Sequence, residues 1–248
     1  MIEQGIAAQM VGEGDRIVIH DGLRVPSPRM EWFDAEHWPT RELLDRGRGA
    51  TFGVRLEIGE AVLRRYRRGG LVALLLSDRY VWTGIERTRP VAEFRLLAAA
   101  VGAGLPVPRP LAALVQREGG FYTGALLMER IPGAETLSGR LARLRDWRDF
   151  DWEALGHLLG RTHALGFRHA DLNAHNVLID GGESLWLIDW DRGSRQTPGS
   201  WPARGLDRQA RSQRNLHGSR VEAADAKEAW QDLLRAHERG GATETARG

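Results

Sequence analysis

The sequence predicts an α+β protein of two lobes: an N-terminal lobe built on an antiparallel sheet with one helix, and a mainly helical C-terminal lobe. Three observations indicate this fold class. Two pairs of strand-like runs surround short turns between residues 54 and 129. A single helical segment separates the two pairs. Beyond the chain-breaking Pro132-Gly133, helix-like spacing of apolar residues becomes common.

The composition suits a globular protein with a sizeable core, because 42% of the 248 residues are hydrophobic and 27% are charged. The absence of cysteine excludes disulfides, thiolate metal sites and a cysteine nucleophile. The N-terminal residues lack the basic start and apolar core of a secretory signal. The uncharged stretch 96–108 is too short to span a membrane. We therefore expect a protein that is soluble or lies on a membrane surface.

The chain is expected to fall into three segments. Residues 1–45 form a loose N-terminal extension, residues 46–131 form the sheet lobe, and residues 132–240 form the second lobe. The tail beyond the last helix is expected to fray.

In the sheet lobe, alternation over residues 54–66 with a turn at Gly59 predicts two strands. Pro90 near the start of an apolar periodic run, and Gly102 after its end, predict a helix over residues 90–101. Two more strands are expected over residues 111–115 and 122–129.

In the second lobe, Asp151 is a candidate N-cap for a helix that reaches Leu165 and stops at Gly166. A last amphipathic helix is expected over roughly residues 223–237.

Between these two helices, residues 177–179 and 185–188 are apolar strand-like runs joined by the turn "DGGES". In an antiparallel hairpin, the start of one strand lies beside the end of its partner. Asn176 starts the first strand and Asp189 ends the second, so we expect both side chains at the open end of the hairpin. Asp171, five residues before Asn176, lies on the loop that enters the same end.

Carboxylate and amide oxygens of this kind suit Mg²⁺, which keeps several waters and binds substrate phosphates. A further carboxylate can orient or deprotonate a hydroxyl. Together they supply what phosphoryl transfer needs, which is mostly positioning and charge neutralisation. The alternative is that Asp171 and Asp189 only cap the ends of the hairpin.

Two motifs in this stretch resemble the protein-kinase-like superfamily. "HADLNAHN" matches the loop H-x-D-x-x-x-x-N, and "IDWD" stands where D-F-G would be. The resemblance implies a bilobal protein-kinase-like fold whose first lobe binds ATP through a glycine-rich loop, a cation and a helical glutamate. "GRGATFG" holds the loop candidates Gly47, Gly49 and Gly53, although it is also compatible with a plain turn.

The usual cation of that superfamily is a lysine, but the only lysine, Lys227, follows both motifs. An arginine must take its place, and the candidates are Arg64, Arg65, Arg67 and Arg68. We prefer Arg64, because "AVLR" aligns it with the lysine of V-A-x-K. At least two of the four are expected to form only a solvated basic edge.

Glu93, in "PVAEFRLL", is the candidate partner of Arg64; the alternative is a surface glutamate that suits the start of a helix. "LLMERIPG" would connect the lobes. There, backbone groups of Glu129 and Ile131 would face adenine, with Met128 behind it.

Several blocks sharpen the resemblance: "EWFDAEHW", "LRRYRRGGLVA", "AEFRLLAAAVGAGLPVPRP", "MERIPGA", "THALGFRHADLNAHNVLID" and "LIDWDRG". Together, over roughly residues 30–216, they resemble the 3-deoxy-D-manno-octulosonic acid (Kdo) kinase family of lipopolysaccharide kinases. No A-P-E segment follows "IDWD", which disfavours a protein kinase. The resemblance implies ATP-dependent phosphorylation of the 4-hydroxyl of Kdo on a lipid A precursor, at the cytoplasmic face of the bacterial inner membrane.

The resemblance also implies residue roles. Asp171 accepts or orients the proton of the sugar hydroxyl, and Asn176 and Asp189 hold Mg²⁺ against the phosphates of ATP. Arg64 replaces the superfamily lysine, and Glu93 braces it.

Other polar residues keep two interpretations. His169 is expected to orient its loop, His175 either packs or contacts substrate, and Asp191 either assists Asp189 or stays solvated. A basic segment follows, which either meets the acceptor and an anionic membrane surface or is an ordinary arginine-rich segment. Its arginines, with Trp201 nearby, are Arg192, Arg195, Arg204, Arg208, Arg211, Arg214 and Arg220.

Three alternatives remain open from the sequence. The acceptor could be a heptose, an aminoglycoside or a fructosamine, or the chain could be a pseudokinase that binds nucleotide without transfer. Its pI of about 9.5 also fits a nucleic-acid-binding protein, but no recognition motif supports that class, and we expect no nucleic-acid partner.

Overall fold

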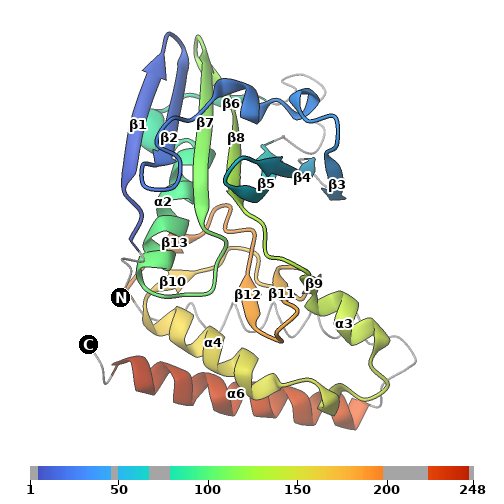
Figure 1. Cartoon of the computed structure of the whole chain (residues 1–248). Coiled ribbons are helices and arrows are strands. Elements are labelled where there is room, and N and C mark those ends of the chain that lie inside the picture. Colours follow the sequence, from blue (N-terminus) through green and yellow to red (C-terminus); the bar gives the residue numbers. More distant parts are fainter. Residues whose placement is uncertain (1–4, 46–49, 67–78, 198–222, 246–248) are drawn as a thin grey trace. The chain divides into compact units, whose positions relative to one another are not determined.

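The computed structural model describes residues 5–45, 50–66, 79–197 and 223–245 (Figure 1). The chain divides into two compact units. Unit 1 comprises residues 1–104 and 108–130, and unit 2 comprises residues 105–107 and 131–248.

Unit 1 is built on an antiparallel sheet in the order β1-β2-β7-β8-β5-β4-β3, with β6 paired to β8 (Figure 1). The predicted strands in the range 54–129 are all present. The strands are β1 (Ala8–Glu13), β2 (Arg16–Asp21), β3 (Glu42–Asp45), β4 (Thr51–Leu56), β5 (Gly59–Arg65), β6 (Tyr80–Val81), β7 (Pro110–Glu118) and β8 (Phe121–Glu129).

The sequence predicts a loose extension over residues 1–45, but the described part of it, residues 5–45, is ordered differently. β1 and β2 form a hairpin, and β2 pairs with β7, so this segment is part of the sheet. The physical reason is the apolar run in β2, where the consecutive Val18 and Ile19 are both fully buried. Trp32 and Phe33, in a short 3₁₀ helix (Met30–Phe33), join the same core.

The predicted helix of this unit is confirmed as α2 (Arg89–Gly102), with Pro90 in its first turn. Its apolar face packs on β7 and β8. Val91, Phe94 and Leu97 are buried at this contact, which fixes which side chains of α2 face the sheet.

Unit 2 is mainly helical, with two small antiparallel sheets, β12-β11-β9 and β10-β13. The Asp151 N-cap is confirmed, since its carboxylate accepts from the N–H of Ala154 at 2.8 Å. The elements are β9 (Glu135–Thr136), α3 (Leu137–Arg143), α4 (Trp152–Ala164), β10 (Phe167–Arg168), β11 (Val177–Ile179), β12 (Leu185–Leu187), β13 (Ser194–Arg195) and α6 (Ala223–Thr245).

α4 and α6 pack side by side (Figure 1). Glycines on α4 permit this close approach: a Cβ at Gly156 would lie 2.3 Å from the carbonyl oxygen of Leu233, and one at Gly160 would lie 2.1 Å from that of His237. α6 continues to Thr245, so the prediction that the helix ends near residue 237 and then frays is wrong over this stretch. The packing against α4 is what extends it.

Candidate functional site

In unit 1, the expected ion pair between β5 and α2 is present. Nη1 of Arg64 donates to Oε1 of Glu93 at 2.9 Å and to Oε2 at 3.3 Å. The side chain of Glu93 is only 2% exposed and that of Arg64 is 18% exposed. A carboxylate removed from water in this way needs a charged partner, so Glu93 holds the guanidinium in one place on the sheet.

Tyr66 and Arg89 extend this pair into a network that sequence reasoning missed. The Tyr66 hydroxyl donates to Oε2 of Glu93 at 2.5 Å. The guanidinium carbons of Arg64 and Arg89 lie 5.3 and 5.4 Å from the centroid of the Tyr66 ring, within cation–π range. Burial and then the charge of Glu93 raise the pKa of Tyr66, so its hydroxyl remains a donor. The period-two alternation that groups Arg64 with Tyr66 was the available signal.

The other predicted cation candidates differ in position. Arg65 is exposed at the end of β5, whereas Arg67 and Arg68 lie outside the described residues. Gly47 and Gly49 also lie outside them. Gly53 lies within β4, opposite Val62 of β5, so it belongs to a strand and not to a loop.

The predicted adenine-facing segment lies at the end of β8. The backbone N–H of Glu129 donates to the carbonyl of Arg109 at 2.9 Å. If Glu129 contacts adenine as predicted, the contact would be made by its carbonyl oxygen. Met128 is buried, and Ile131 is half-buried.

In unit 2, the predicted hairpin is confirmed. β11 pairs with β12 with Val177 opposite Leu187, and one step further the N–H of Ile188 donates to the carbonyl of Asn176 at 3.0 Å. Asn176, just before β11, and Asp189, shortly after β12, therefore lie on neighbouring chain segments at the open end of the hairpin. Nδ2 of Asn176 also donates to the backbone carbonyl of Asp171 at 2.8 Å, which ties the preceding loop to the same end.

His169 holds that loop through both of its ring nitrogens, which agrees with the orienting role expected from the sequence. Its Nε2 lies 2.8 Å from the carbonyl oxygen of Ile188, and its Nδ1 accepts from the N–H of Asp171 at 3.1 Å. The second bond makes Nδ1 an acceptor, so the ring proton lies on Nε2. The ring is buried and packs edge-on against Trp190 at 4.8 Å between centroids.

Asp189 has a left-handed backbone, with φ of +60°. This region is uncommon for residues other than glycine, although aspartate and asparagine tolerate it best. Such conformations persist where the surrounding structure imposes them, and they cluster at functional sites. Here the residue before Asp189 is held at both of its backbone groups: the N–H of Ile188 bonds to Asn176, and its carbonyl bonds to His169.

The donor set at this end of the hairpin fits Mg²⁺. The hydrogen bond to Asp171 engages the amide nitrogen of Asn176, so its oxygen is the atom that a metal could take, together with the carboxylate of Asp189. In the described part of the chain, no group of three or more His, Cys, Asp or Glu side chains could hold a metal. A Mg²⁺ ion would thus depend on phosphate and water oxygens for the rest of its ligands.

An ion-pair cluster that the sequence did not predict braces the closed end of the hairpin. The guanidinium of Arg140 on α3 donates to both carboxylate oxygens of Glu183 in the turn, at 2.8 and 2.9 Å, and to Glu135 at 2.7 Å. Hydrogen bonds from Arg143 and then Arg140 lower the pKa of Glu135 to about 2. Both ends of the hairpin are thereby tied to neighbouring elements of unit 2.

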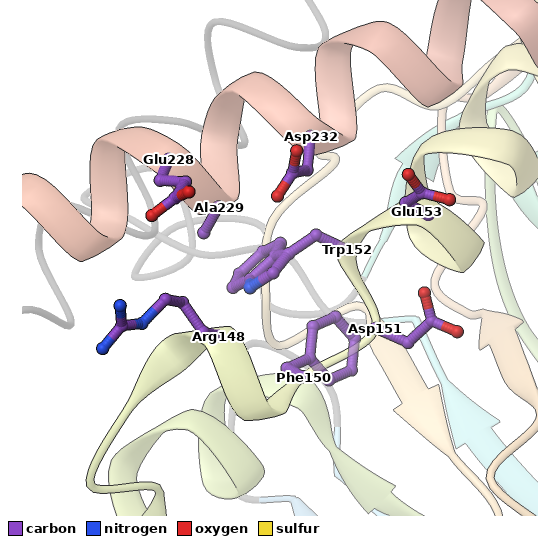
Figure 2. Close-up of a pocket in the computed structure, with 8 residues that line it drawn as sticks. All are labelled: Arg148, Phe150, Asp151, Trp152, Glu153, Glu228, Ala229 and Asp232. Atoms are coloured by element: carbon purple, nitrogen blue, oxygen red, sulfur yellow. The ribbon is translucent and has the colours of Figure 1, made fainter.

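A separate hollow of about 380 Å³ lies beside α6 and contains none of the predicted site residues (Figure 2). Its lining carries four carboxylates and one guanidinium, a balance that disfavours a polyphosphate ligand. The lining residues are Arg148, Phe150, Asp151, Trp152, Glu153, Glu228, Ala229 and Asp232.

Known proteins resemble the chain over most of its length. A profile described as the lipopolysaccharide kinase (Kdo/WaaP) family matches residues 31–237. A 3-deoxy-D-manno-octulosonic acid kinase from Stenotrophomonas maltophilia (strain R551-3) is 44% identical over 212 residues, 84% of each chain. One of the same name from Xanthomonas oryzae pv. oryzae (strain PXO99A) is 41% identical over 238 residues, 95% of this chain and 94% of the relative.

A solved structure titled "WaaP in complex with acyl carrier protein" superposes with a TM-score of 0.50 and 16% identity, covering 82% of this chain and 83% of that one. At this identity the similarity shows the fold alone, and the predicted kinase-like fold class is confirmed. The profile and the relatives show more: the chain belongs to the lipopolysaccharide kinase (Kdo/WaaP) family.

Proposed function

We propose that the protein transfers the γ-phosphate of ATP to the 4-hydroxyl of Kdo on a lipid A precursor. The single observation that supports this proposal is the arrangement at the open end of the β11–β12 hairpin, where Ile188, next to Asp189, bonds to the backbone of Asn176 and the Asn176 side chain bonds to Asp171. The identity of the acceptor is proposed from the relatives, which are named Kdo kinases.

In the proposed reaction, Asp171 orients the acceptor hydroxyl and takes its proton as the oxygen forms a bond to the γ-phosphorus. The bond between that phosphorus and the bridging oxygen of ADP breaks, and the electron pair leaves with ADP. Proton transfer to a positioned carboxylate contributes typically about 10²–10⁴-fold to the rate. The exposed position of Asp171 allows an acceptor to reach it.

Asn176 and Asp189 would hold Mg²⁺, which when bound supplies positive charge to the phosphate oxygens. Arg64 is the proposed cation for the same phosphates, and Glu93 keeps its guanidinium in place. Arginine presents a planar fork that suits phosphate oxygens, so the replacement of the superfamily lysine is chemically reasonable. Gly47 and Gly49 are the proposed phosphate-loop glycines, and backbone groups of Glu129 and Ile131 are the proposed adenine contacts.

We further propose that the protein works at the cytoplasmic face of the inner membrane as a peripheral protein. None of the helices in the described ranges is both long enough and apolar enough to cross a bilayer. The lipid A part of the acceptor would remain in the membrane. The exposure of arginines such as Arg192 and Arg195, which are suited to an anionic surface, supports this placement.

The test is phosphate transfer by the purified protein with Mg²⁺-ATP. Acceptors would be lipid A precursors that carry one or two Kdo sugars, with a core heptose, an aminoglycoside and a fructosamine in parallel. We expect a mass increase of one phosphate only on the Kdo acceptors. Transfer to another acceptor alone would replace the substrate assignment, and nucleotide binding without any transfer would make the protein a pseudokinase.

A further inference from the structure

A chain of hydrogen bonds connects the start of α3 to the side chain of His175. Oγ1 of Thr136 accepts from the N–H of Gly139 at 3.1 Å, as the N-cap of α3. The hydroxyl oxygens of Thr136 and Ser138 lie 2.9 Å apart. Oγ of Ser138 in turn lies 2.9 Å from Nδ1 of His175.

The direction of these bonds follows from where each proton can go. If Thr136 donates to Ser138 and Ser138 donates to His175, every hydroxyl proton has an acceptor within the described part of the chain. In this direction Nδ1 of His175 is an acceptor, and the proton of the neutral ring lies on Nε2. Nε2 has no hydrogen-bond partner among the described residues, so it is a donor directed at something other than this part of the protein.

His175 belongs to the same loop as Asp171, the proposed acceptor-site carboxylate. His175 is exposed and lies four residues after Asp171 in the same loop, whereas the next residue, Asn176, is buried. The loop itself is held: the N–H of His175 donates to Oδ1 of Asn173 at 2.9 Å, and the N–H of Ser138 donates to the carbonyl of Ala174 at 3.0 Å. Ser138 therefore fixes both the backbone of the loop and the ring.

A histidine that only packs in the loop would not need the hydrogen bonds from Thr136 and Ser138. The buried hydroxyl of Ser138, 5% exposed as a residue, fixes the tautomer and the orientation of a ring that is itself exposed. The cost of ordering an exposed side chain is recovered when it binds a ligand. An acceptor that carries negative charge also needs a donor near Asp171, because the carboxylate would otherwise repel it.

We propose that His175 determines acceptor specificity by donating from Nε2 to an anionic oxygen of the acceptor, and that Ser138 and Thr136 are positioning residues for it. This inference rests on the proposed function. The anionic oxygen belongs either to the carboxylate of Kdo or to a phosphate of lipid A, which present the same chemistry to an imidazole N–H.

The test uses two variants that each keep one end of the ring. His175→Asn keeps a polar atom near Nδ1 for Ser138 but removes Nε2, whereas His175→Gln places an amide near Nε2 without the Ser138 bond. We expect the acceptor KM of His175→Asn to rise about tenfold or more, with the KM for ATP unchanged, as for the loss of one hydrogen bond to a charged group. His175→Gln and Ser138→Ala should show a smaller rise. The exposed His157→Gln on α4 is the matched control.

Two altered acceptors identify the source of the charge. If the carboxylate of Kdo is the partner, reducing it to the alcohol should abolish the difference between wild type and His175→Asn. If a lipid phosphate is the partner, removing the phosphates should abolish it. An unchanged acceptor KM in His175→Asn, or an increase that survives both alterations, would overturn the inference.

A readout without ATP separates this inference from the proposed reaction. NMR signals of the His175 ring should shift when free Kdo or a lipid A phosphate headgroup is added to the wild-type protein, and Ser138→Ala should weaken that binding. Wild-type protein that binds through His175 but transfers no phosphate would contradict the kinase and support the inference. An active enzyme whose His175 signals do not move with either ligand would do the opposite.

Discussion

The candidate site residues of unit 1 and those of unit 2 are held in place by different means. In unit 1, side chains hold Arg64: Glu93 pairs with its guanidinium, and Tyr66 donates to the same carboxylate. In unit 2, the side chains of His169 and Asn176 bond to backbone groups around Asp171 and Asp189: the carbonyls of Asp171 and Ile188 and the N–H of Asp171.

This difference indicates which substitutions should affect activity without affecting stability. Glu93 is buried, so a change in its partners leaves a charge without compensation and costs folding free energy. The carboxylate of Asp189 can be altered while the backbone bonds around it remain. We therefore expect substitutions in unit 1 to lower activity and stability together, and substitutions of the loop carboxylates to lower activity alone.

Among the variants that compare the two units, Asp189→Asn has the largest expected effect. Asparagine tolerates the left-handed backbone as aspartate does, so the midpoint of thermal unfolding should stay within a degree or two of wild type. Loss of the proposed metal ligand should lower the rate of phosphate transfer by about 10³-fold, or about 4 kcal/mol. Initial rates over a range of Mg²⁺ concentrations would measure it, with the exposed Asp149→Asn as control. A lower unfolding midpoint would erase the contrast between the two regions.

Arg64→Ala comes next and tests the other side of the comparison. It leaves the buried Glu93 without its cation, which should lower the free energy of unfolding by about 3 kcal/mol, together with ATP affinity. Arg64→Lys should recover most of the stability. Arg55→Ala, which removes an exposed pair with Glu60, should cost less than about 1 kcal/mol in urea unfolding. Equal stabilities for the two alanine variants would show that the pair is not structural.

A change of pH tests the packing of the helices in unit 2, away from the ion pair of unit 1. Nδ1 of His163 on α4 lies 2.8 Å from Nε2 of His237 on α6. Burial and then His237 lower the pKa of His163 from 6.5 to about 3. The unfolded chain therefore binds more protons than the folded chain below pH 6.5. As the pH is lowered, the free energy of unfolding should decrease by up to about 1.4 kcal/mol per pH unit.

Urea unfolding between pH 7 and pH 5, where few carboxylates titrate, would measure this slope. His163→Gln should flatten it, and the exposed His157→Gln on the same helix should leave it unchanged. A slope in His163→Gln equal to that of wild type would assign the pH dependence to other groups.

Tyr66→Phe is the smallest expected effect. It removes one donor from the Glu93 carboxylate but leaves the Arg64 bond, so the free energy of unfolding should fall by about 1–2 kcal/mol. The KM for ATP should rise a few-fold while the acceptor KM stays the same. If the variant matches wild type in both measurements, Tyr66 does not help to position Glu93.

Local signals predicted much of the structure. The helices α2 and α4, the strands on either side of α2 and the β11–β12 hairpin follow from turn residues, caps and periodicity that lie within a few residues of each other. The ion pair of Arg64 with Glu93 could be expected only because the superfamily resemblance assigned both positions.

What the sequence did not predict depends on contacts between distant segments. The hairpin β1–β2 joins the sheet because β2 pairs with β7, about a hundred residues later. The donation from Tyr66 to Glu93 and the clamp from Arg140 to Glu183 likewise exist only once separate elements pack. Loop patterns such as "HADLNAHN" indicate which residues matter, but they do not reveal that Ser138 fixes the ring of His175.

The most direct test of the central claim is the rate of phosphate transfer by Asp171→Ala, with ATP and Kdo acceptor both saturating. We predict a rate lower by about 10²–10⁴-fold, with nucleotide affinity and the unfolding midpoint unchanged. A rate equal to that of wild type would contradict the account, because the loop would then hold no group that acts on the acceptor hydroxyl.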